Sequence, residues 1–277
     1  MQKNNYIGKL FVFIGAVLWS INAPLVKLLD LNPLLVCGLR SLIAGAVLSP
    51  FICLKKIHFS PWLFLYILSY STLCSSIIIA LQHTSAAIAI GMQYSSIIWI
   101  FFIHTLYKRT FSIKKFIPVF FIFLGVICFM LSGLTNGTTF GNLIALTEGI
   151  SFALMTISFQ RARIKNPIGV TSLSNMCCGA LIFVFSSPEI TDAFILSVKD
   201  WIVLLILGVI QVGLGYTFFN LGVQRTSAQS AAIISLWEMI LGPVWVALFF
   251  GEYPTFPIFI GFLIILFGML LNARSNQ

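Results

Sequence analysis

Long apolar runs, separated by short polar segments, recur along the whole chain. A helix needs about 20 predominantly apolar residues to cross a hydrocarbon layer about 30 Å thick. Ten runs qualify, and they lie near residues 8–28, 33–54, 61–82, 85–107, 116–134, 141–160, 167–187, 201–223, 227–250 and 256–272. Runs this long and regular exceed what the core elements of a soluble domain require. The pattern therefore predicts an all-α membrane protein with ten transmembrane helices.

The basic residues set the expected orientation. With the N-terminus in the cytoplasm, 13 of the 16 Lys and Arg residues fall in segments on that side, and only Lys27 and Lys199 fall on the other. The positive-inside rule then places both termini in the cytoplasm. The first run lacks the cleavage site of a secretory signal peptide, so we expect it to stay as a helix. These features predict a multi-pass protein of the cell inner (plasma) membrane.

The two halves of the chain repeat each other. Matching segments are residues 32–45 with 166–179, which both begin with Asn-Pro, residues 84–86 with 226–228, and Gly125 with Gly268. We therefore expect two five-helix repeats, residues 1–136 and 137–277. Five crossings in each repeat require the second to enter the membrane from the opposite side. Inverted repeats of this kind place a substrate site near the midplane between them.

The composition leaves almost no surface for water. Hydrophobic residues make up 59% of the chain, charged residues only 8%, and the mean hydropathy is +1.04, whereas a soluble domain carries about 25% charged residues. The net charge of +9 comes from the loops and not from a basic-aromatic face, so we expect no nucleic-acid partner. The six cysteines lack the spacing of a disulfide framework or a zinc site, and we interpret them as small hydrophobic residues.

No sequence motif points to catalysis. The chain has no Walker-type phosphate loop, no His-Glu-x-x-His pair and no nucleophile elbow. Its three histidines, His58, His83 and His104, lie near the ends of apolar runs without the spacing of a metal site. We therefore expect that the protein is not an enzyme and that it holds neither a cofactor nor a metal. ATP-driven transport has no support.

Three stretches resemble a known family. They are Trp19 to Asn22 (WSIN), Arg40, and Ser235 to Glu252 (SLWEMILGPVWVALFFGE), a ninth run with a glutamate, then a proline and a final Gly-Glu pair. Together with the repeat, they make the chain similar to the drug/metabolite transporter (DMT) superfamily, in its EamA-type ten-helix branch. The resemblance implies a carrier, commonly an exporter of amino acids or related metabolites. The chain departs from the family at Lys108-Arg109, where an acidic residue often ends the fourth span.

Three ionisable residues lie within the apolar runs, where each costs about 2.5 to 3.5 kcal/mol on insertion scales. Glu238 is expected to bind a substrate ammonium or to exchange protons, because Pro243 disturbs its helix and Trp245 shares its face. Glu148 is a second candidate for substrate binding and proton coupling. Arg40 keeps its charge in any surroundings. We expect it to be a structural intramembrane charge paired with a carboxylate, although it could instead meet an anionic group of the substrate.

Aromatic and amide side chains complete the expected substrate site. An aromatic face attracts a desolvated cation by about 2 kcal/mol, although Trp is also frequent at membrane interfaces. The expected substrate-binding residues are Trp19, Asn22, Tyr94, Glu148, Gln211, Trp237, Glu238 and Trp245. Other polar residues at helical spacing either line the path or hold helices together; they are Ser71, Ser75, Ser76, Gln93, Ser96, Tyr216 and Asn220.

These features favour a secondary active transporter that moves a small amine-bearing metabolite across the inner membrane by alternating access. An amino acid or a related zwitterion or cation would fit, and proton coupling and export belong to this expectation. One alternative is a nucleotide-sugar or lipid-linked-sugar translocator of the same fold, but its anionic ligands would need several inward cations, and only Arg40 is plainly available. The other is a non-transporting membrane scaffold. The expected partners are a small-molecule substrate and the lipid bilayer, and the chain is expected to be a monomer or a weak homodimer.

Overall fold

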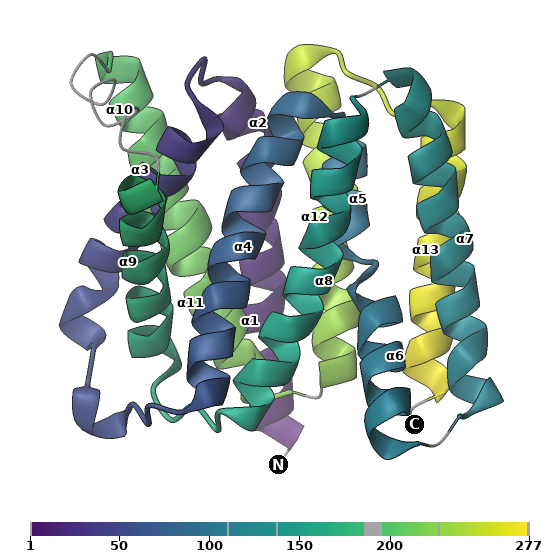
Figure 1. Cartoon of the computed structure of the whole chain (residues 1–277), viewed down its shortest axis with the longest axis horizontal. Coiled ribbons are helices and arrows are strands. Elements are labelled where there is room, and N and C mark those ends of the chain that lie inside the picture. Colours follow the sequence, from purple (N-terminus) through teal and green to yellow (C-terminus); the bar gives the residue numbers. More distant parts are fainter. Residues whose placement is uncertain (1, 110, 137, 186–195, 227, 276–277) are drawn as a thin grey trace.

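The computed structural model describes residues 2–109, 111–136, 138–185, 196–226 and 228–275. Within these ranges all the regular structure is helical (Figure 1). The helices are α1 (Gln2–Ser20), α2 (Asn22–Lys27), α3 (Pro33–Leu48), η1 (Ser49–Phe51), η2 (Leu54–Lys56), α4 (Pro61–His83), α5 (Ala86–Gln93), α6 (Ser96–Lys108), α7 (Ile113–Asn136), α8 (Thr139–Arg161), α9 (Pro167–Phe185), α10 (Val198–Leu205), η4 (Ile206–Leu214), α11 (Gly215–Val223), α12 (Ala228–Phe250) and α13 (Phe256–Ser275).

Among the described residues, seven helical stretches are long and apolar enough to cross a membrane. They are Tyr6–Lys27, Pro33–Phe51, Pro61–His83, Ala86–Tyr107, Thr139–Phe159, Pro167–Val184 and Val198–Val223. Three shorter apolar helices accompany them, Phe116–Ser132, Trp237–Phe250 and Phe256–Leu271. The predicted all-α membrane class is confirmed. The count of ten crossings and the side on which the termini lie stay predictions.

The Asn-Pro pairs that mark the repeat begin helices in both halves. Asn32 Oδ1 accepts a hydrogen bond from Leu34 N at 2.8 Å, and Pro33 occupies the first turn of α3. Asn166 Oδ1 accepts one from Gly169 N at 3.1 Å where α9 begins. An amide oxygen satisfies a backbone N–H that the first turn of a helix leaves unpaired, and proline is tolerated there. The repeated sequence therefore has the same local role twice.

Two long helical stretches are interrupted, one in its last third and one near its middle. The break between α1 and α2 falls at Ile21, and the break between α5 and α6 falls at Tyr94 and Ser95. Pro243, where we expected a disturbed helix, lies inside α12, which stays helical from Ala228 to Phe250. A proline removes one backbone hydrogen bond, and the packed neighbours α1 and α5 support the rest of the helix.

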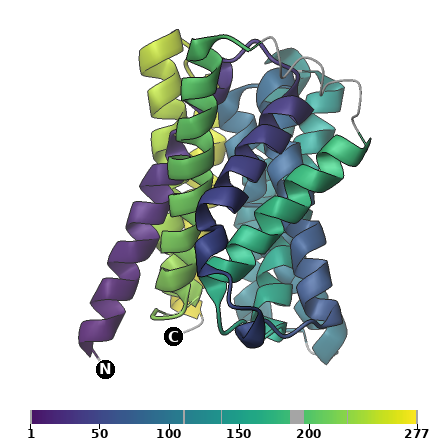
Figure 2. The same ribbon diagram turned by 90° about the vertical axis from the view of Figure 1, so that its left-hand side faces the viewer.

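The helices of the first half pack mainly against those of the second. α7 packs along α13, α3 along α9, α4 along α8, and α1 along both α11 and α12. Figure 1 shows the α7–α13 pair at one side of the bundle. Figure 2 faces the opposite side, where α3 and α9 lie next to each other. The contacts between halves therefore run through the whole molecule.

Glycines allow α7 and α13 to approach closely. A methyl group at Gly125 would lie 2.8 Å from the carbonyl oxygen of Gly261, and one at Gly268 would lie 2.9 Å from that of Pro118. In lipid, where no hydrophobic effect drives helices together, such small residues permit the close packing that holds them. Gly125 and Gly268, which the repeat aligns, therefore serve the same contact from its two sides.

Both ends of the chain lie at one end of the bundle. α1 begins at the end where α13 finishes, and α2 and α10 lie at the other end (Figure 1). An even number of crossings produces this arrangement.

Candidate functional site

A small cavity lies inside the bundle, beside the two helix breaks. Its lining comes from both halves of the chain and consists of Trp19, Asn22, Arg40, Leu73, Ile77, Gln93, Gln211, Val212, Tyr216 and Glu238. Its volume is about 20 Å³, which is room for about one water molecule. A larger ligand therefore requires the surrounding helices to separate.

Arg40 lines this cavity from α3 and is 2% exposed. Its Nη1 donates hydrogen bonds to Asn22 Oδ1 at 2.8 Å and to Gln211 Oε1 at 3.3 Å, and its Nη2 donates one to the Cys74 carbonyl at 3.0 Å. The one ion pair among the described residues joins two other side chains. Arg40 therefore connects α3 with α2, α4 and η4 through neutral acceptors, and the carboxylate partner we expected is not among them.

Glu238 lines the cavity from α12 and is 8% exposed. Tyr94, at the break between α5 and α6, donates its hydroxyl to Ser235 O at 2.7 Å and to Glu238 Oε2 at 3.3 Å. Gly242, one turn further along α12, faces the end of the Ile90 side chain of α5. The break between α5 and α6 thus places Tyr94 beside the carboxylate.

Glu148 lies behind Glu238, on α8, and is fully buried. Neither of its carboxyl oxygens has a hydrogen-bond partner in the described part of the chain, and Glu238 is close enough to interact with it electrostatically. The adjacent Gly149 lets α8 pack tightly against α5, since a methyl group there would lie 3.0 Å from the Met92 carbonyl. Ionisable residues inside membrane proteins commonly belong to substrate or proton pathways.

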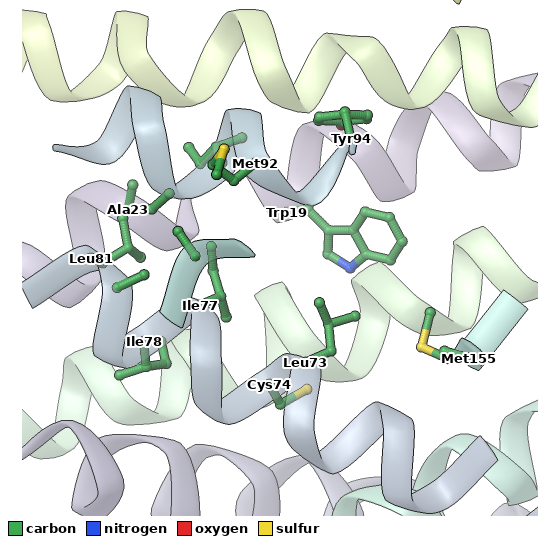
Figure 3. Close-up of a cluster of buried hydrophobic side chains, with 14 of the residues drawn as sticks. Trp19, Ala23, Leu73, Cys74, Ile77, Ile78, Leu81, Met92, Tyr94 and Met155 are labelled. Carbon is green, nitrogen blue, oxygen red and sulfur yellow. The ribbon is translucent and has the colours of Figure 1, made fainter. Parts of the chain in front are cut away.

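Trp19 forms an aromatic wall of the cavity. Its ring contacts Tyr216 at 4.7 Å and Phe219 at 4.6 Å between centroids, and the side chain is 3% exposed. Figure 3 shows the indole inside the buried cluster that also holds Leu73 and Tyr94. Indole Nε1 has no hydrogen-bond partner within the described ranges. The wall therefore offers both a ring face and an unused donor.

A model of the EamA-like transporter family matches the chain twice, over residues 6–131 and 139–274. The chain belongs to this family. A protein of Archaeoglobus fulgidus described as an uncharacterized transporter is 24% identical over 273 residues, which cover 97% of each chain. A crystal structure of a protein with 17% sequence identity matches 98% of both chains with a TM-score of 0.66, a likeness that shows the fold alone. The predicted resemblance is confirmed, and the chain is a multi-pass membrane protein of a transporter family.

In this family member, four predicted substrate-binding residues line the cavity, namely Trp19, Asn22, Gln211 and Glu238. Tyr94 contacts Glu238, and Glu148 lies within electrostatic range of it. The two remaining tryptophans lie elsewhere. Trp237 is 45% exposed and packs edge-on against Phe13 of α1 at 5.8 Å. Trp245 donates its Nε1 to Ser20 Oγ at 3.1 Å and therefore holds α12 against α1.

Some residues of the site were not singled out by sequence reasoning. Leu73, Ile77 and Val212 give the cavity apolar walls, and Tyr70, which is fully buried, packs edge-on against Tyr216 with 4.9 Å between ring centroids. Tyr70, Leu73 and Ile77 share one face of α4 at a spacing of three to four residues. That spacing is the signal that could have identified the α4 wall.

Several buried polar atoms lie around α4, α9 and α11 without a hydrogen-bond partner in the described residues. They are Tyr70 Oη, Ser174 Oγ, Asn175 Oδ1 and Thr217 Oγ1. Each such atom costs about 1 to 3 kcal/mol when it stays unpaired. Water or a polar solute between these helices would satisfy them.

A second, larger pocket of about 390 Å³ opens between α2, the start of α5 and the segment that joins α12 to α13. At its wall Lys27 Nζ lies 2.7 Å from Glu252 Oε2, and the two side chains are 23% and 32% exposed. Glu252 Oε1 also accepts a hydrogen bond from Ala86 N at 3.1 Å. The Glu252 carboxylate therefore connects α2 and α5 to the segment that follows α12.

Proposed function

We propose that this chain is a secondary active transporter that moves a small amine-bearing metabolite, an amino acid or a related zwitterion or cation, by alternating access. The observation that carries the proposal is the buried Glu238 carboxylate, held by Tyr94 in a cavity with Trp19 on its wall. A carboxylate and an aromatic face together attract an ammonium group. The family assignment supports transport in general, and this chemistry supports the substrate class.

The proposal includes ten crossings, arranged as inverted halves of residues 1–136 and 137–277. In the proposed repeat, α8 is the equivalent of α1, α11 of α4, and α12 of α5 with α6. The α1–α11 contact then corresponds to the α8–α4 contact, and the α1–α12 contact corresponds to that of α8 with α5 and α6. The α3–α9 and α7–α13 contacts map onto themselves. A two-fold relation between halves produces this pattern, and the substrate site then lies at their junction.

We place both termini in the cytoplasm and the protein in the inner membrane. The excess of basic residues on the proposed cytoplasmic side supports this orientation. The common end of α1 and α13 in Figure 1 supports an even number of crossings.

Proton coupling through Glu148 and Glu238 is part of the proposal. Two carboxyl groups lie near each other, both are buried, and one has no hydrogen-bond partner in the described residues. A substrate ammonium that binds Glu238 would change the charge beside Glu148. The position of the pair supports exchange of a proton for the substrate.

The test is transport by purified protein in proteoliposomes, with labelled neutral amino acids and primary amines as probes. We expect Glu238→Gln to abolish both binding and uptake, because the amide carries no charge for the ammonium. The matched control Asp30→Asn removes an exposed carboxylate and should leave uptake unchanged. We expect Glu148→Gln to remove the response of the rate to a pH gradient. Full transport by Glu238→Gln would exclude this residue from the mechanism.

A further inference from the structure

Arg40 is a buried cation with no carboxylate among its hydrogen-bond acceptors. It is 2% exposed, and its acceptors are the side-chain oxygens of Asn22 and Gln211 and the backbone carbonyl of Cys74. The ion pair found among the described residues is Lys27 with Glu252, at a different pocket. A charge taken out of water needs compensation that neutral dipoles supply only in part.

The guanidinium also has hydrogen-bonding capacity left. It carries five N–H donors, three hydrogen bonds use its terminal nitrogens, and its Nε has no acceptor in the described ranges. Arginine binds a carboxylate through two parallel N–H···O bonds, which match the spacing of the two carboxylate oxygens. A carboxylate that entered the cavity would therefore find both charge and donors.

The Cys37 thiol shares an acceptor with Arg40. Cys37 lies one turn before Arg40 on α3, and its Sγ donates a hydrogen bond to the Cys74 carbonyl at 3.2 Å. The same carbonyl accepts from Arg40, so the backbone of α4 serves both groups.

The carboxyl group of Glu238 lines the same cavity as Arg40, and the two side chains form no ion pair with each other. Tyr216 lies within electrostatic range of both. A guanidinium and a carboxyl group kept apart in one cavity match a ligand that carries both a carboxylate and an ammonium group.

We propose that Arg40 binds the carboxylate of the substrate while Glu238 binds its ammonium, so that the site selects zwitterions over simple amines. This inference rests on the proposed function. The apolar walls formed by Leu73, Ile77 and Val212 would face an apolar side chain of the substrate. The cavity must widen from about 20 Å³ to admit it, which is the movement that alternating access requires.

Matched ligands separate the two charges. The probes are leucine with 3-methylbutylamine, phenylalanine with 2-phenylethylamine, and methionine with 3-(methylthio)propylamine, where each amine lacks only the carboxylate. We expect the wild-type protein to bind the amino acid of a pair at least about 30-fold more tightly than the amine, the usual cost of removing one partner of a buried charge pair. Equal affinity within every pair would overturn the role of Arg40 without any variant.

The variants locate the selectivity. We expect Arg40→Gln to weaken binding of the amino acid by about the same factor and to leave binding of the amine unchanged. Arg40→Lys should be intermediate, since it keeps the charge but loses the two-pronged geometry. Lys114→Gln, an exposed basic residue, is the matched control. If Arg40→Gln folds and weakens both ligands equally, Arg40 is structural and the inference is wrong. If neither amines nor amino acids bind the wild type, the proposed function fails as well.

Discussion

At the scale of single residues, Trp19 and Trp237 each follow a leucine within an apolar run, yet their surroundings are opposite. Trp19 is 3% exposed on the cavity wall, whereas Trp237 is 45% exposed beside Phe13. We expect Trp19→Leu to weaken binding of an amine-bearing ligand about tenfold, because the desolvated aromatic face is lost. Trp237→Leu should leave binding unchanged. Titration of both variants with the same ligand is the measurement, and equal losses would show that the cavity wall plays no special role.

Trp237 also shows where sequence reasoning ended at this scale. It precedes Glu238 in the chain, so its depth in the membrane could be predicted, but successive residues point about 100° apart around a helix. An amphipathic stripe normally tells which face is buried. α12 has no amphipathic stripe, because both lipid and the protein core are apolar. The position of Glu238 at a cavity could be predicted from its charge, but the outward position of Trp237 could not be predicted from the sequence.

At the scale of elements, the ion pair of Lys27 with Glu252 joins α2 to the segment after α12 and, through Ala86, to α5. Both side chains are partly exposed, so the pair contributes at most about 1 kcal/mol to stability. The pair lies at the wall of the larger pocket, where an alternating-access carrier would need to open and close. We expect Lys27→Glu to impair transport by repulsion and the exchange K27E/E252K to restore it. Uptake rates of the two variants decide this, and an exchange variant as impaired as the single one would contradict it.

The helix breaks mark the limit of prediction at this scale. Ten apolar runs could be predicted from length and hydropathy. The break at Ile21 has a local signal, because Pro24 follows three residues later and has no N–H to donate to the Ser20 carbonyl. The break at Tyr94 and Ser95 has no proline near it, and there Tyr94 donates its hydroxyl toward Ser235 and Glu238 of α12. Pro243 lies inside α12 without ending it. Local sequence therefore predicts the helices and the first break, and tertiary contacts accompany the second.

At the scale of the whole molecule, the internal repeat is the sequence feature that predicts a transporter, whereas the number of apolar runs predicts only a membrane protein. Matching Asn-Pro segments and glycines could be found in the sequence, and in the structure they start α3 and α9 and line the α7–α13 contact. The small cavity of about 20 Å³ and the larger pocket of about 390 Å³ could not, because cavities depend on side-chain packing between halves.

Counterflow tests the central claim most directly. Proteoliposomes with the wild-type protein are loaded with a millimolar concentration of the unlabelled amino acid that binds most tightly. They are then diluted into a trace concentration of the same amino acid carrying a label. An alternating-access carrier exchanges one molecule for another, so we predict transient accumulation of label above the outside concentration, and none with Glu238→Gln. Label that only equilibrates, or that enters equally without internal amino acid, would contradict the account.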